Sequence, residues 1–141
     1  MLEGKIGRII FSRILEDEDL ADAIKQRAEK SGVKAGLITV IGSLKTAVLG
    51  YYKEGEYKHI RLDGPLEIAS CAGNIAVDEK GGTVIHAHIV VTDEDGKAFG
   101  GHLMQGSVVG VTAELAIIEG VGLNLQRIFD GKTKLKLLRL S

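Results

Sequence analysis

The sequence predicts one α+β domain over residues 1–141, with a mostly antiparallel, partly barrel-like β-sheet and one main amphipathic helix near the N-terminus. With 141 residues, of which 45% are hydrophobic, the chain can bury a single core. One early segment has helical spacing, and β-branched apolar runs separated by glycine-containing turns follow it. One proline and nineteen glycines suit a bulged sheet.

A strand over residues 5–15 precedes the predicted helix. The acidic run Glu16 to Asp19 opens the helix, where negative charge complements the helix dipole. Gly32 is suited to the left-handed cap at the other end. Apolar residues at four-residue spacing predict the face that lies on the sheet: Leu20, Ile24 and Ala28.

The rest of the chain predicts strands. Their ranges are 35–43, 46–52, 57–62, 66–77, 83–92, 98–104, 107–119 and 123–129. Asp63-Gly64-Pro65 is one of the predicted turns. Val108 to Ile118 is apolar on both faces, which indicates a strand buried on two sides. Alternating lysines predict the solvent face of a final strand: Lys132, Lys134 and Lys136.

Three of the four histidines lie between residues 86 and 102. Because a strand alternates its side chains, His86 and His88 point the same way, about 7 Å apart. If Glu94-Asp95-Gly96 is a three-residue loop with Gly96 in the left-handed conformation, Asp93 pairs with Lys97. Counting back along both strands then places His88 opposite His102, and directly opposed residues share a face.

Three imidazoles on one face predict a divalent metal site on His86, His88 and His102, with zinc favoured and copper, nickel or iron also compatible. Two alternatives are a proton-linked cluster and a register slip at Gly100-Gly101 that separates His102. Structural zinc sites usually have four protein ligands, so three ligands indicate catalysis or ligand capture. Such a metal activates water or polarises a carbonyl group.

Glu114 is the candidate catalytic partner because it interrupts an apolar strand, and a buried carboxylate needs a partner such as a metal-bound histidine. The alternative is a buried salt bridge or an interface pair. Glu67 and Asn74 are weaker candidates, since Asn74 also suits a turn after Gly73. His59 lies in a charged segment and is expected at the surface.

Composition excludes several classes of protein. The single cysteine, Cys71, leaves no disulfide within the chain and is expected to be a small buried residue. A net charge of −1 with intermixed signs argues against nucleic acid as a partner. No apolar run is long enough for a membrane span, and no leader segment is evident, so we expect a cytoplasmic protein.

Several motifs, in this order, resemble the plants-and-prokaryotes-conserved (PPC) domain, also known as DUF296. They are Asp63-Gly64-Pro65-Leu66-Glu67-Ile68, Gly73-Asn74-Ile75, His86-Ala87-His88, Gly100-Gly101-His102-Leu103 and Thr112-Ala113-Glu114. The resemblance extends from Arg8 to Leu135 and is most specific between His86 and Glu114. It implies a compact α+β fold assembled as a homotrimer. Plant members carry DNA-contacting AT-hook peptides, but this sequence has no Arg-Gly-Arg-Pro core.

A more distant resemblance concerns the metal. His86, His88 and His102 are similar to the zinc site of α-acetolactate decarboxylases, although the spacing differs and this chain is shorter. The resemblance does not place the other catalytic groups of those enzymes here. Two functions are therefore expected. One is a metal-dependent enzyme or small-molecule binder whose substrate the sequence does not reveal, with a carbonyl compound as one compatible class. The other is an association module with a DNA-linked role and a purely structural metal.

Overall fold

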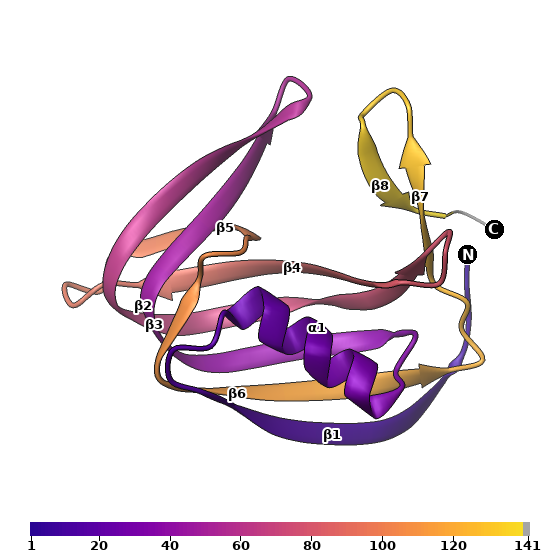
Figure 1. Cartoon of the computed structure of the whole chain (residues 1–141), viewed down its shortest axis with the longest axis horizontal. Helices are drawn as coiled ribbons and strands as arrows, with labels where there is room; N and C mark the ends of the chain where they lie inside the picture. Colours follow the sequence, from indigo (N-terminus) through magenta and orange to yellow (C-terminus); the bar gives the residue numbers. More distant parts are fainter. Residues whose placement is uncertain (140–141) are drawn as a thin grey trace.

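The computed structural model describes residues 1–139, which form one eight-stranded sheet and one helix. Figure 1 shows the helix lying across one face of the curved sheet. In the sheet, the strand order is β1-β6-β2-β5-β4-β3-β7-β8. The elements are β1 (Lys5–Leu15), α1 (Leu20–Ser31), β2 (Gly36–Lys53), β3 (Glu56–Asp78), β4 (Thr83–Thr92), β5 (Ala98–Leu103), β6 (Val108–Val121), β7 (Gln126–Asp130) and β8 (Leu135–Leu138).

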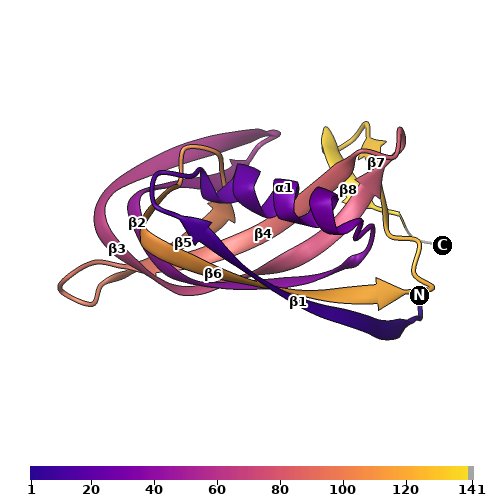
Figure 2. The same cartoon turned by 60° about the horizontal axis from the view of Figure 1, so that its bottom comes forward.

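The sheet closes partly on itself, which confirms the predicted barrel-like α+β fold. Strand β2 pairs with β6, β5 and β3, so that β2, β5, β4 and β3 form a closed circuit of neighbours. Among the described strands, every pairing is antiparallel except that of β3 with β7. The strong curvature of the sheet is visible in Figure 2.

The helix α1 has the predicted caps and the predicted buried face. The Asp19 side chain accepts a hydrogen bond from the Asp22 backbone N–H at 3.0 Å, and Gly32 ends the helix with φ 71°. Each large apolar side chain buried against the sheet contributes about 1.5–3 kcal/mol to folding. The buried helix residues are Leu20, Ala23, Ile24 and Ala28.

In two places, a pair of predicted strands forms one continuous strand. The segments 35–43 and 46–52 both belong to β2, and the segments 57–62 and 66–77 both belong to β3. The turn predicted at Asp63-Gly64-Pro65 is wrong. The two strands stay paired there because a register shift between Leu44 and Thr46 accommodates the extra residues as a bulge.

The C-terminal hairpin also differs from its prediction. The strand expected over 123–129 is β7, Gln126–Asp130, and β8 follows it. Lys132 and Lys134 lie in the turn between the two strands. Only Lys136 lies within β8, where its ammonium group is 3.2 Å from a carboxylate oxygen of Asp78.

Strand β6 is buried on one side only, so the prediction of burial on both sides is wrong. On the helix side Ala113, Leu115 and Ile117 are fully buried, whereas Glu114 is exposed on the other side. The sheet face opposite the helix carries large apolar side chains that nothing in residues 1–139 covers. We call this surface the open apolar face: Ile9, Phe11, Leu37 and Ile41.

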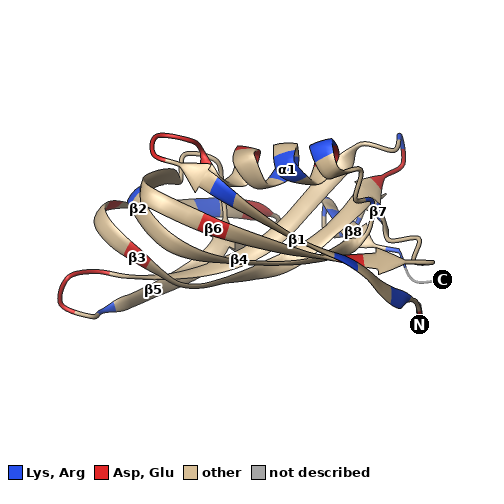
Figure 3. Ribbon diagram, turned by 90° about the horizontal axis from the view of Figure 1, so that it is seen from below, with Lys and Arg blue, Asp and Glu red and all other residues tan. Residues whose placement is uncertain are grey.

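The intermixed charges and the buried cysteine are as the sequence predicts. Figure 3 shows Lys and Arg interspersed with Asp and Glu along the ribbon. Cys71 is fully buried, and burial raises the pKa of its thiol to about 12. Within residues 1–139, no helix has the length and apolar character needed to cross a membrane.

Candidate metal centre

The β4–β5 hairpin has the predicted register. The Asp93 N–H donates to the Lys97 carbonyl oxygen at 3.1 Å, and Gly96 has φ 77°. His88 pairs directly with His102. The register therefore does not slip at Gly100-Gly101, and the alternative that separated His102 is wrong.

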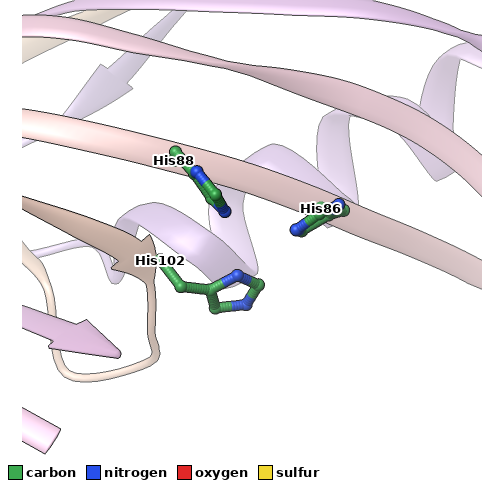
Figure 4. A group of neighbouring side chains, drawn as sticks. All are labelled: His86, His88 and His102. Atoms are coloured by element: carbon green, nitrogen blue, oxygen red, sulfur yellow. The ribbon is translucent and has the colours of Figure 1, made fainter. Parts of the chain in front are cut away.

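The three histidines form one cluster, drawn in Figure 4. One ring nitrogen from each of His86, His88 and His102 lies within 4.8 Å of the others. The ring centroids are 5.1 to 5.7 Å apart. In residues 1–139, no other group of three or more His, Cys, Asp or Glu side chains is this close. The donor set consists of imidazole nitrogens alone, which suits zinc and other first-row transition metals.

Arg127, which the sequence analysis did not place at the site, lies against the histidine cluster. Arg127, on β7, is only 7% exposed. Its Nη2 group donates to Asn74 Oδ1 and lies 2.9 Å from His86 Nδ1. Nη1 donates to the Lys136 carbonyl oxygen at 3.2 Å. Asn74 therefore lies inside β3, as predicted for residues 66–77, and acts as a hydrogen-bond acceptor, so the alternative role of holding a turn is wrong.

Two of the histidines, His86 and His102, are in the neutral form that a metal requires. The pKa of His86 is lowered to about 4, first by burial and then by the positive charge of Arg127 and the other histidines. The pKa of His102 is also lowered, by burial and then by His88 and Arg127. Both rings are therefore neutral at pH 7 and keep a lone pair for a metal. His102 Nδ1 is buried without a hydrogen-bond partner in the described structure, so the residues present fit a metal ion.

The cluster borders a cavity instead of being enclosed. A cavity of about 440 Å³ is lined by His88 and His102 on one side and by three tyrosines of the β2–β3 hairpin, Tyr51, Tyr52 and Tyr57. The Tyr57 ring lies 5.1 Å from the His102 ring, centroid to centroid. A metal on the histidines is thus accessible to a small molecule.

The Tyr52 hydroxyl donates to the Thr133 carbonyl oxygen at 2.7 Å. This bond links the β2–β3 hairpin to the turn between β7 and β8, and both hairpins contribute to the site. Figure 1 shows the two hairpins rising from the same side of the sheet.

The carboxylates singled out from the sequence lie elsewhere. Glu114 is exposed and pairs with Arg13 and Ile41, while β4 is reached only across further strands of the sheet. The expectation that Glu114 is buried beside the histidines is therefore wrong, since the face of β6 that carries it is uncovered. Glu67 is also exposed and lines a different cavity. His59 is exposed, as expected.

Two solved structures resemble the whole chain. A metal-containing protein from Archaeoglobus fulgidus is 30% identical, with a TM-score of 0.89 and 99% of each chain covered. A plant- and prokaryote-conserved protein from Pyrococcus horikoshii is 35% identical, with a TM-score of 0.88, covering 100% of this chain and 96% of that one.

More distant relatives share part of their length. The α-acetolactate decarboxylase of Bacillus subtilis has a TM-score of 0.58 at 12% identity, over 89% of this chain and 57% of the enzyme, which is a likeness of fold. A curated relative, the bifunctional protein GlmU of Synechococcus sp. (strain JA-3-3Ab), is 28% identical over 127 residues. The match covers 89% of this chain and only 19% of that protein.

The family is shown by a direct match. Residues 1–121 match the model of the Plants and Prokaryotes Conserved (PCC) domain, which is the same family as the PPC domain. The matched range contains all three histidines of the cluster and ends before Arg127. The likeness to the Pyrococcus horikoshii protein over the whole chain agrees with this match. The chain belongs to the plants and prokaryotes conserved domain family.

Proposed function

We propose that this protein is a metal-dependent enzyme or small-molecule binder that holds a divalent metal, with zinc favoured, on His86, His88 and His102. The ligand class we propose is a small carbonyl compound. The neighbour from Archaeoglobus fulgidus, described as metal-containing, supports the presence of a metal. Three neutral imidazoles are a ligand set that zinc enzymes use.

One observation carries this proposal: the histidine cluster borders a cavity and has no fourth protein ligand. In residues 1–139, no Cys, Asp or Glu side chain joins the three histidines. Structural zinc sites are usually closed by four protein ligands, whereas catalytic sites keep an open position. When bound, the metal supplies Lewis acidity for a carbonyl group or a bound water.

The chain's own residues have separate roles in this proposal. The hairpin register fixes His88 and His102 side by side, and burial keeps His86 and His102 neutral for metal binding. Tyr57 packs near His102 and forms part of the cavity wall. Because no carboxylate accompanies the histidines in residues 1–139, the candidates for a general acid or base are Tyr57, bound water or a group from another copy.

We further propose a homotrimer, in which neighbouring copies cover the open apolar face. Phe11 is 78% exposed and Ile9 63% exposed, and exposed apolar patches of this kind mark protein interfaces. This surface also favours the second candidate function, an association module with a DNA-linked role and a structural metal. The net charge of −1 argues against direct binding of nucleic acid. A cytoplasmic location is proposed, where the single thiol stays reduced.

The deciding experiment is the metal content of protein purified without a histidine tag, measured by mass spectrometry of the elements. We expect about one zinc ion per chain in the wild type, as in three-histidine sites. His88→Asn should lose the metal, whereas the matched control His59→Asn, at an exposed position outside the cluster, should keep it. Absence of metal after reconstitution with zinc, or full metal in His88→Asn, contradicts the proposed site. If His88→Asn also dissociates the oligomer, the structural role of the alternative is favoured.

A further inference from the structure

Arg127 is a buried cation without an anionic partner. None of the ion pairs found in residues 1–139 includes Arg127, although its side chain is almost fully buried. Its Nε atom is buried and makes no hydrogen bond. A buried charge is costly unless it is paired, so an unpaired guanidinium in contact with the histidine cluster indicates that its partner is not part of the chain.

None of the hydrogen-bond partners of Arg127 is a carboxylate. They are the amide of Asn74, the ring of His86 and the carbonyl group of Lys136. The cavity next to the histidines has no Asp or Glu in its lining. A divalent metal on the histidines would add two further positive charges to this partly buried space, and such a field attracts an anion.

The contact between Arg127 and His86 cannot persist once His86 binds a metal as a neutral ring. A guanidinium only donates hydrogen bonds, so His86 Nδ1 must be the acceptor. If the metal binds Nε2, Nδ1 carries the proton and faces the Arg127 donor. If the metal binds Nδ1, it takes the position of the guanidinium. In both cases the Nη2 N–H that faces His86 is released, and it becomes available together with the unbonded Nε N–H, while the bonds to Asn74 and Lys136 remain.

We propose that the histidine centre binds a small carboxylate, and that Arg127, released from His86 by the metal, is the group that recognises it. This inference rests on the proposed metal site. The planar fork of a guanidinium matches the two oxygens of a carboxylate. The tyrosines on the cavity wall, with Tyr52 and Tyr57 rings 5.6 Å apart, provide apolar surface for the body of the ligand. A carboxylate with an apolar or aromatic body therefore fits better than inorganic phosphate.

The test is calorimetric titration of zinc-loaded protein with benzoate, with its neutral analogue benzamide and with inorganic phosphate. We expect benzoate to bind and benzamide to bind at least about tenfold more weakly, because a hydrogen bond to a charged group is lost. Arg127→Met should weaken benzoate binding by about tenfold to a hundredfold for the same reason. Arg127→Lys, which keeps the charge, should retain part of the affinity. Tighter binding of phosphate than of benzoate overturns the carboxylate assignment.

The matched control is Arg61→Met, which removes an exposed arginine outside the site. It should leave benzoate affinity unchanged. Unchanged affinity in Arg127→Met with full zinc content overturns the inference while the metal site stands. If the wild type takes up no zinc, the proposed function itself is contradicted, and this inference loses its basis.

If both Arg127 variants lose the metal, NMR of the wild-type protein tests the inference without a substitution. In the wild type, the NMR signal of the Arg127 Nε–H should shift when zinc is added and shift again when benzoate follows. A signal that stays fixed through both additions overturns the release of Arg127.

Discussion

His88 and His102 lie directly opposite each other on β4 and β5, and the loop that joins the two strands sets this pairing. The backbone hydrogen bond from Asp93 to Lys97 closes the loop, and Gly96 adopts positive φ within it. Two metal-ligand candidates thus depend on the geometry of five consecutive residues.

Replacing Gly96 by valine should destabilise this hairpin. A side chain at φ 77° is strained, and we expect the free energy of unfolding to fall by about 1–2 kcal/mol. Urea unfolding measures the change. The control is Gly131→Val, at a turn position where an added Cβ meets nothing within 4 Å and φ is not positive. Equal stability of the two variants would contradict the role of the loop.

Gly73→Ala, a substitution on β3, should disturb the histidine cluster on the adjacent strand β4. Gly73 pairs with Ala87 between the two histidines of β4, and a Cβ on Gly73 would overlap the His86 carbonyl oxygen. Because backbone must move, we expect a loss of about 1–3 kcal/mol in stability and weaker zinc binding. The zinc affinity is measured by competition with a chelator. Gly131→Ala is the control, and no difference between the two variants in zinc affinity would refute the expected coupling.

The stability of the metal-free protein should depend on pH through His86. Its pKa is about 4 in the folded chain, below the usual value near 6.5, so the folded state binds fewer protons than the unfolded state. The contribution is therefore fully present above about pH 6.5 and is lost as the pH falls toward 4. Melting temperatures in the presence of a chelator should decline over this window. His86→Gln should flatten the decline, and an identical profile in both proteins would exclude His86 as its source.

The hairpin and its histidines could be predicted from sequence because their geometry is local. His88 and His102 are joined by a short loop whose glycine fixes the register, so counting along two strands was sufficient. Arg127 could not be found in this way, because it reaches His86 through the parallel pairing of β7 with β3, across 41 positions of sequence. Glu114 was misplaced because apolar spacing does not reveal which face of a strand another element covers.

The two long strands show a similar limit. Asp63-Gly64-Pro65 has the composition of a turn, yet it lies within β3 because the paired strand β2 accommodates the irregularity. Turn propensity is a local property, whereas the continuity of β3 depends on a partner about twenty residues away. The helix, by contrast, has its caps and its apolar face within one short segment, and it was predicted correctly.

Cys71 should be unreactive in the native protein. Its side chain is fully buried and burial raises the pKa of the thiol to about 12, so the reactive thiolate is scarce at pH 8. We expect a disulfide reagent to modify Cys71 only after denaturant is added. Rapid modification of the native protein at pH 8 would show that this part of the core opens readily.

Charged substitutions on the open apolar face should dissociate the proposed trimer. Phe11→Glu places a carboxylate where a second copy would bury an aromatic ring, and we expect a smaller molecular mass in sedimentation equilibrium. The matched control is Phe129→Glu, since Phe129 is 58% exposed but lies on β7. A wild type that sediments as a monomer, or a Phe11→Glu variant that stays assembled, would contradict the proposed interface.

The hydrogen bond between Tyr52 and Thr133 joins two hairpin ends, which tolerate sequence change differently from the strands that carry the histidines. The histidines stand on paired strands whose opposite faces form the core, so changes near them disturb folding. The tyrosines and Thr133 stand near exposed hairpin ends, where length and composition tolerate variation. Exchanging the hairpin ends could therefore change the ligand preference of the cavity while leaving the histidine cluster in place.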